Sequence, residues 1–498
     1  MTGLALNEDC TNFFFRKRID CCNEDALREL IDHYALGKVD QLVFNPNAQL
    51  VNYAGSPWEM PGENAQARFE GPVDPTTATE TGTDMATVAN RSQLYLRTVG
   101  GFGQTGINPY AFWCRECRRR AISPWISLRA NDMHNAHDLN NHLHSRFWSE
   151  HPQWWRCGHR PFCNWYDRQL DFLQPEVQEH FLSLVTDALE RFDLDGIEID
   201  WMRFPYHFRP GQESEGRSAI LKIHRRIRKQ ANDSAKRLGH PVQVAIRCAS
   251  TPQDAWELGV DTISLSQEKL VDIVTPTPFY STTDTAIPLQ FWRALLAPGT
   301  RLYAGVEIIV RPYPAAQAIY PASPAMVRSQ CAVALHAGAD KLYLFNYMDF
   351  LLEHHADAFR EILVTASDPQ QAVRGSRRAV LTYHDTQSPG NACPALLPLE
   401  LQNLTTIRLP IGPAPNANRP TTVVLGGDLP GKENLRVFLN GRELLPANSL
   451  PIDHEVPEGT GSLTAFDATN LCKDGDNVIE LLPSMGELRW AEINISAQ

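Results

Sequence analysis

The feature that most constrains the fold is a regular alternation of short apolar runs with helical patterns over residues 1–370. The runs are rich in Val, Ile and Leu, as in strands buried on both faces of a parallel sheet. They predict strands at 12–16, 41–45, 125–130, 196–201, 242–248, 271–275, 302–309 and 341–347. Helical patterns separate these runs, at 24–36, 83–99, 110–120, 174–192, 217–238, 289–296, 324–337 and 356–365.

Eight strands with helices between them predict a (β/α)8 barrel. An open doubly wound sheet is the alternative, but no Gly-x-Gly-x-x-Gly follows the first strand. After about residue 370, short alternating runs between turn signals replace the helical patterns. They predict strands at 378–382, 405–409, 421–425, 435–439, 477–481 and 487–495. We therefore expect a barrel domain over residues 1–370 and a smaller all-β sandwich over residues 371–498.

Composition excludes several classes of partner. The 498 residues are 43% hydrophobic and 21% charged, with a net charge of −12, which argues against binding to nucleic acid or to an anionic membrane surface. No apolar run is long enough to span a membrane, and no signal peptide is visible at the start. The 11 cysteines include one isolated Cys-x-x-Cys, at Cys114 and Cys117, so we expect buried thiols and no metal centre. The sequence indicates neither a compartment nor an oligomeric state.

Residues 193–205 carry the strongest functional signal: Asp-Leu-Asp-Gly-Ile-Glu-Ile-Asp-Trp-Met-Arg-Phe-Pro. Glu198 and Asp200 lie two residues apart in the predicted fourth strand, so both point to the same side. Two carboxylates on one face of an apolar strand are costly to bury unless a partner or substrate uses them. Acidic residues at the carboxyl end of a barrel strand are typical of catalytic groups. A solvated edge strand is the alternative.

This segment resembles the strand-four motif of glycoside-hydrolase-like barrel proteins, because Asp195-Gly196, Asp200 and Arg203-Phe204-Pro205 match its pattern. The resemblance implies a (β/α)8 fold and a catalytic role for Asp200. The segment is also similar to the signature of family 18 chitinases, but Met202 stands where those enzymes have the proton-donating Glu. The run around Gly475-Asp-Asn-Val-Ile-Glu resembles galactose-binding-like sandwiches. A module that only packs against the barrel is an equal alternative for that domain.

Glycoside hydrolysis needs a second carboxyl group across the scissile bond. Glu307, near the end of the seventh predicted strand, suits this role, and retaining enzymes of the large barrel clan resemble this strand-four, strand-seven arrangement. Asp284, after the sixth strand, is the rival proton donor. Glu198 lies one layer deeper and is expected to orient Asp200 or to act as the acid itself.

Further polar residues at the predicted strand ends are candidate sugar contacts. Four arginines suit an acidic sugar, although they could equally neutralise the carboxylates: Arg129, Arg203, Arg247 and Arg311. Seven other polar residues are also candidate substrate contacts: Asn131, Asp132, His134, Tyr280, Asp284, Asn346 and Tyr347. The His-rich loop 131–144 offers a second interpretation, a metal-dependent hydrolase or deacetylase. However, the spacing of its histidines matches no zinc motif.

The favoured function is a glycoside hydrolase that cleaves an oligo- or polysaccharide, with Asp200, Glu307 and Glu198 as catalytic candidates. An acidic substrate is one option. A carbohydrate-binding barrel without catalysis and the metal-dependent hydrolase are the alternatives. The expected partner is a carbohydrate, and no cofactor is implied.

Overall fold

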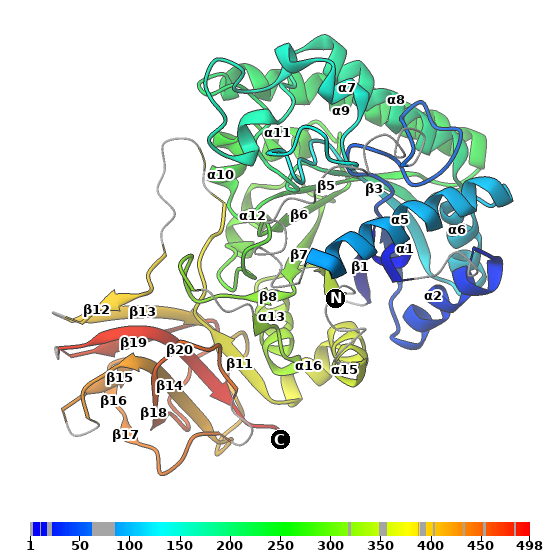
Figure 1. Ribbon diagram of the computed structural model, residues 1–498. Coiled ribbons are helices and arrows are strands. Elements are labelled where there is room, and N and C mark those ends of the chain that lie inside the picture. The colour runs from blue at the N-terminus through cyan, green and yellow to red at the C-terminus, as the bar shows by residue number, and fades with distance from the viewer. Residues whose placement is uncertain are drawn as a thin grey trace. The chain divides into compact units, whose positions relative to one another are not determined.

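The computed structural model describes residues 3–9, 11–16, 22–61, 85–316, 320–347, 356–386, 388, 395–401, 404–431, 434–451, 455–482 and 485–498. Among them, eight strands close into a barrel in the order β1-β10-β7-β6-β5-β4-β3-β2 (Figure 1). The strands are β1 Leu4–Glu8, β2 Gln41–Phe44, β3 Ser123–Arg129, β4 Gly196–Asp200, β5 Gln243–Ala249, β6 Ile273–Thr277, β7 Arg301–Glu307 and β10 Lys341–Phe345. The predicted (β/α)8 barrel, followed by a β-sandwich region, is confirmed.

The register of the central strands brings charged residues into one row. Arg129 of β3 pairs with Asp200 of β4, which in turn pairs with Arg247 of β5. One step deeper, Leu128, Ile199 and Ile246 form a row of fully buried apolar side chains, so the strand centres are held by hydrophobic packing. The sequence therefore places the charges at the carboxyl ends of strands whose cores are apolar.

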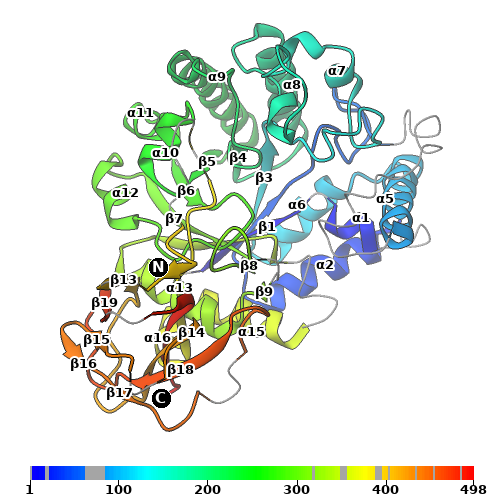
Figure 2. The same cartoon turned by 60° about the vertical axis from the view of Figure 1, so that its left-hand side comes forward.

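Helices surround the strands and begin at residues with side-chain caps, such as Asn23 before α2 and Asn108 before α6. The longer helices are α2 Glu24–Leu36, α5 Met85–Thr105, α6 Pro109–Arg119, α8 Pro175–Arg191, α9 Glu213–Leu238, α13 Pro324–His336 and α15 Ala356–Ser367. The short ones are α1 Asn12–Arg16, α7 Arg146–Ser149, α10 Pro252–Glu257, α11 Thr262–Gln267, α12 Leu289–Leu295 and α16 Pro369–Arg374. Helices α8 and α9 lie side by side in Figures 1 and 2. Among the described helices, none has the length and apolar character needed to cross a bilayer.

The predicted first strand is wrong. Residues 12–16 form the helix α1, and the barrel begins at Leu4–Glu8. The run Phe13-Phe14 packs on a helix face against Phe102 and Trp113, where ring centroids lie 5.3–6.3 Å apart. A five-residue apolar run does not distinguish a strand from a helix, because both bury it equally well.

The chain after the barrel forms two antiparallel sheets, ordered β11-β20-β14-β18-β17 and β13-β19-β15-β16 (Figure 2). Their strands are β11 Arg377–Val380, β13 Thr405–Pro410, β14 Thr421–Asp428, β15 Val437–Leu439, β16 Arg442–Glu443, β17 Leu445–Pro446, β18 Ser462–Asp467, β19 Asp476–Leu481 and β20 Glu487–Ile495. A short strand, β12 Leu399–Glu400, pairs with β20. Apolar residues from both sheets share one core, including Ile407, Val423, Ile479 and Ile493. The sequence did not predict β18, whose outer residues are polar.

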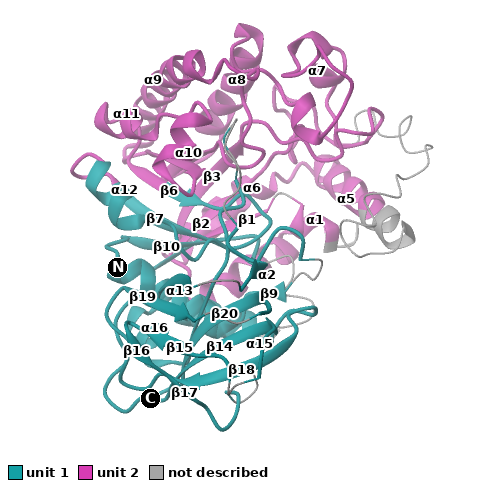
Figure 3. Cartoon of the chain, turned by 90° about the vertical axis from the view of Figure 1, so that its left-hand side faces the viewer, with its two compact units in different colours: residues 1–5, 275–295, 301–498 teal, residues 6–274, 296–300 magenta. Residues whose placement is uncertain are grey.

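The chain divides into two compact units, residues 1–5, 275–295 and 301–498, and residues 6–274 and 296–300 (Figure 3). In the first unit, the sandwich region packs directly on the last barrel helices. Arg419 donates hydrogen bonds to the carbonyl oxygens of Val373 at 2.7 Å and Arg374 at 2.9 Å, at the carboxyl end of α16. A Cβ on Gly412 would overlap the backbone of Ala332 in α13. The boundary at residue 370 stays a prediction.

Gly196 provides a test of the packing at the start of β4. A methyl group at this position would overlap the buried ring of Trp125, whose indole is tied to Ser123 at 2.9 Å. We therefore expect Gly196→Ala to lower the free energy of unfolding by about 1–3 kcal/mol, because the core has no space for it. Urea denaturation measures the change.

Gly100→Ala in α5 is the matched control, since among the described residues no atom outside its own helical turn and chain neighbours lies within 4 Å of the added methyl group. We expect this substitution to be neutral or to stabilise the helix by up to about 1 kcal/mol. Equal effects of the two substitutions would contradict the packing account.

Candidate active site

Asp200, the last residue of β4, is fixed by hydrogen bonds on both carboxylate oxygens. Nη1 of Arg247 lies 3.1 Å from each oxygen, and Oδ1 also accepts the backbone N–H groups of Met202 and Arg203 at 2.8 Å. Asp200 is 1% exposed and Arg247 is fully buried. Such a set of donors suits a carboxylate anion held in one orientation. The sequence placed Asp200 correctly at the barrel mouth, and its catalytic role stays a prediction.

Glu198 lies deeper in the barrel, two residues before Asp200, and is buried. Its Oε1 accepts a hydrogen bond from Ser127 of β3 at 2.7 Å. The serine comes from the strand position that faces Glu198 in the register. This contact favours a supporting role for Glu198, although the side chain also has interactions beyond this bond.

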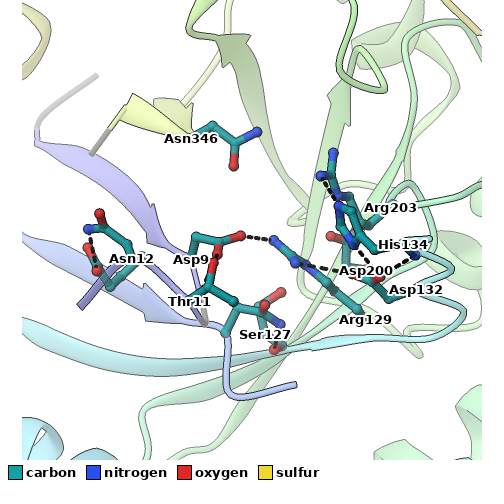
Figure 4. Close-up of polar contacts among 12 residues, drawn as sticks. Asp9, Thr11, Asn12, Ser127, Arg129, Asp132, His134, Asp200, Arg203 and Asn346 are labelled. Carbon is teal, nitrogen blue, oxygen red and sulfur yellow. Dashed lines mark hydrogen bonds and ion pairs between the residues drawn. The ribbon is translucent and has the colours of Figure 1, made fainter. Parts of the chain in front are cut away.

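A chain of buried charges lies beside Asp200 (Figure 4). Arg129 of β3 is placed between two carboxylates, forming a short ion pair with Asp9 and a 3.1 Å contact with Asp132. Burial raises the pKa of Asp9, but the Arg129 charge and hydrogen bonds from Thr11 outweigh it and lower the pKa to about 2. For Asp132, burial is again outweighed, by His134, Arg129 and Arg203, so its pKa lies well below the usual value.

His134 and Arg203 extend this network toward the exterior. His134 Nδ1 lies 2.5 Å from Asp132 Oδ1, and its Nε2 lies 3.0 Å from Arg203 Nη2 (Figure 4). Because a guanidinium group can only donate, Nε2 is the acceptor and Nδ1–H donates to Asp132. The His134 side chain is 38% exposed, so it is the part of the network that a ligand can reach.

The four predicted anion-binding arginines have different environments. Arg129 and Arg247 are paired with carboxylates, as the neutralisation alternative predicts. Arg203 is bound to His134, and Arg311 is tied through its backbone to Thr282. The buried Nε of Arg311 has no hydrogen-bond partner among the described residues. Two of the four arginines are therefore committed to holding acids, which weakens the case for an acidic sugar.

Asn131 and the His-rich loop are used for local structure. Both ends of the Asn131 amide bind the backbone of Leu170, at 2.8 and 2.9 Å. His144 Nε2 contacts the carbonyl oxygen of His134, and burial lowers the pKa of His142 to about 4. Within the described ranges, which include all of loop 131–144, no three His, Cys, Asp or Glu side chains gather as metal ligands. The metal-dependent alternative thus gains no ligand set from this loop.

Glu307, the last residue of β7, is fully buried in the first unit. Its Oε1 accepts the backbone N–H of Ile308 at 2.8 Å, and Oε2 lies 3.4 Å from the amide nitrogen of Asn346. Asn346 has a positive φ of 58°, a left-handed conformation that asparagine adopts more readily than most residues. Burial and the nearby charge of Glu307 raise the pKa of Tyr347 well above its usual value, so its hydroxyl remains a donor, 3.4 Å from the Glu307 carbonyl.

Asp284 is also buried, but its carboxylate is already occupied. Oδ2 forms a short contact with Nδ1 of His384, and Oδ1 accepts the backbone N–H of Ala286 at 2.9 Å. Tyr280, in the same loop, is 38% exposed. The oxygens of Asp200 and Glu307 also have partners, so the rival role of Asp284 as proton donor stays a prediction.

Two residues of this region were not predicted from the sequence. Asp9 directly follows β1, which the sequence analysis missed, and the apolar run Leu4-Ala5-Leu6 could have identified both the strand and the residue at its end. His384 comes from beyond the barrel, and no local pattern links it with Asp284, 100 residues earlier.

Comparisons with known proteins concern the fold. No protein-family model matches the chain, and no curated protein matches it in sequence. Among solved structures, it is similar to α-L-fucosidase isoenzyme 2 from Paenibacillus thiaminolyticus, with 12% identity, a TM-score of 0.44, and coverage of 74% of this chain and 49% of that one. The chain thus spans about half the length of the fucosidase.

In two other similar structures, the alignment with this chain covers almost the whole of the known protein. The PgaB (BpsB) glycoside hydrolase domain from Bordetella bronchiseptica is 10% identical, with a TM-score of 0.42 and coverage of 73% of this chain and 99% of that one. An α-amylase from Geobacillus thermoleovorans is 11% identical, with a TM-score of 0.40 and coverage of 97% and 99%. These structural neighbours, like the fucosidase, are glycoside hydrolases.

The depressed pKa of Asp9 predicts a specific acid sensitivity. A carboxylate whose pKa falls from 3.8 to about 2 on folding stabilises the fold above pH 4, and this contribution is lost as the pH falls through about 2. The shift corresponds to about 2 kcal/mol. We expect the free energy of unfolding to fall as the pH is lowered from about 4 to about 2. In Asp9→Asn, the free energy of unfolding should depend less steeply on pH over this range.

Urea unfolding at several pH values between 2 and 7 measures both effects. The variant should be less stable than the wild type at neutral pH, because Arg129 loses one of its anionic partners. If the free energies of unfolding of the two proteins change with pH in parallel, the pKa of Asp9 is not lowered by folding.

Proposed function

We propose that the protein hydrolyses glycosidic bonds, with Asp200 as nucleophile or base and Glu307 as proton donor. The observation that carries the proposal is the fixed, buried carboxylate of Asp200 at the carboxyl end of a barrel strand, where active sites of this fold lie. Glu307 ends a second strand in the same way. Glycoside hydrolysis uses two such carboxyl groups.

The contacts of Asp200 support the role proposed for it. Asp200 is bound to the guanidinium group of Arg247, which stabilises the anion that a nucleophile or base needs. Glu307 is proposed for the other role, because glycoside hydrolysis needs a second carboxyl group that protonates the leaving oxygen.

The preferred substrate is an uncharged oligosaccharide. Arg129 and Arg247 already neutralise carboxylates, so they are poorly available for a sugar acid or sulfate. The ring of His134 is partly exposed, so a sugar can contact it, although a sugar hydroxyl would compete with Arg203 for Nε2, because Nδ1–H is bound to Asp132 and Nε2 to Arg203.

Substitution of the two carboxyl groups tests the proposal. We expect Asp200→Asn and Glu307→Gln each to lower kcat by roughly 10²–10⁴-fold, because each removes a group that acts in bond cleavage. Hydrolysis of a panel of neutral and acidic oligosaccharides, followed by product chromatography, provides the measurement.

Asp195→Asn is the matched control. Asp195 belongs to the same sequence motif but lies before the first residue of β4, where it binds Arg118 at 2.9 Å and Ser123 at 2.6 Å. Its removal should leave kcat unchanged within about twofold, since stability functions belong to this end of the barrel. A wild-type protein that binds but never cleaves the panel would favour the carbohydrate-binding alternative, and normal turnover by Asp200→Asn would end the proposal.

A further inference from the structure

A small pocket lies beside the carboxyl end of β3, at the mouth of the barrel. Its volume is about 20 Å³, enough for one water molecule or one methyl group. Its apolar lining comes from three segments of the second unit. Ala48 and Trp58 belong to the loop after β2, Ala130 and Met133 to the loop after β3, and Leu170 to the segment before α8.

The polar side chains of the lining are already bound to other groups. Both ends of the Asn131 amide bind backbone groups, at 2.8 and 2.9 Å. Gln49 accepts a backbone N–H at 3.1 Å, and its amide nitrogen lies 3.2 Å from the sulfur of Met133. Asp132 belongs to the charge network described above, which binds both of its oxygens. Because a buried water needs two to four polar partners, this lining favours an apolar occupant.

Stacked rings fix one wall of the pocket. The ring of His180 in α8 stacks on those of Trp58 and Phe147, with centroid distances of 4.4 and 3.6 Å. The indole of Trp58 donates a hydrogen bond to the carbonyl oxygen of His180 at 2.9 Å. Burial lowers the pKa of His180 to about 4, so the imidazole is neutral at pH 7 and adds no charge to the wall. A preformed wall of this kind reduces the cost of binding a ligand.

Direct contacts connect the pocket with the proposed nucleophile. Ala130 donates its backbone N–H to the carbonyl oxygen of Asp200 at 3.2 Å. Asp132 is bound to Arg129, the residue that pairs with Asp200 in the strand register. His134, the partly exposed member of the network, is bound to Asp132 (Figure 4). A sugar that contacts the ring of His134 is therefore separated from the lining of the pocket by one hydrogen bond.

We propose that this pocket recognises a methyl group of the sugar substrate, from either a 6-deoxy sugar or an N-acetylated sugar. The inference rests on the proposed glycoside hydrolase function and names the substrate class that the site prefers. A methyl group fits the volume and gains free energy by leaving water. A hydroxymethyl group would bring a hydroxyl against polar groups that are already bound, and burying an unpaired hydroxyl costs free energy.

Sugars that differ by one methyl group test the pocket without relying on hydrolysis. The full chain, labelled at its methionine methyl groups, is titrated and followed by NMR, because Met133 lines the pocket and its signal is assigned by its absence in Met133→Leu. The pairs are L-fucose and D-arabinose, L-rhamnose and L-lyxose, and N-acetyl- and N-formylglucosamine. We expect the methyl-bearing sugar of one pair to shift the Met133 signal and to bind at least about 10-fold more tightly than its partner. The pair that responds identifies the source of the methyl group.

Ala48→Val fills the pocket, and Ala54→Val, at an exposed position of the same loop, is the matched control. We expect Ala48→Val to reduce the preference for the methyl-bearing sugar to less than about twofold, because the added carbons occupy the space. Ala54→Val should keep the preference. Equal affinities within all three pairs for the wild type, or a preference that survives in Ala48→Val, would overturn the proposal.

Hydrolysis measured alongside binding separates failure of the pocket from failure of the proposed function. Its substrates are the p-nitrophenyl glycosides of the three methyl-bearing sugars, in both anomeric forms, and the oligosaccharide panel. Methyl-dependent binding without hydrolysis would reject the hydrolase and retain the pocket. Hydrolysis without methyl-dependent binding would reject the pocket alone, and the absence of both would reject both.

Discussion

The buried ion pair between Asp200 and Arg247 is the interaction on which the candidate site depends. The two residues face each other in the register of β4 and β5 and are almost inaccessible to water. Removing two charges from water costs several kcal/mol for each ion, and only close contact and further hydrogen bonds recover it. The backbone amides of Met202 and Arg203 supply those bonds, which is why the turn after β4 and the carboxylate form one rigid unit.

The same constraint is met a second time at the ends of β1 and β3. Arg129 lies between Asp9 and Asp132, so each buried charge again has a partner of opposite sign. The mouth of the barrel is therefore built largely from balanced charges. Because these arginines serve the scaffold, the member of this network that a ligand can reach is the partly exposed His134.

Much of the fold could be predicted because its signals are local. The apolar alternation around Ile197 and Ile199 identifies β4, and the helical pattern of 24–36 coincides with α2. Asp200 and Glu307 could be placed at strand ends for the same reason. The start of β1 and the position of Asp9 were missed, since the five residues 12–16 fit two structures equally well. His384 could not be found, because its contact with Asp284 arises only when the chain returns to the barrel after 100 residues.

Chemical rescue of Asp200→Ala tests the central claim most directly. The substitution leaves a cavity beside Arg247, into which a small carboxylate such as formate can bind and take over both the charge and the chemistry. If Asp200 acts as nucleophile or base, the variant is inactive alone and regains turnover as formate is added, whereas formate leaves the wild type and Glu307→Gln unchanged. An Asp200→Ala protein that hydrolyses the substrate at the wild-type rate without formate would contradict the account.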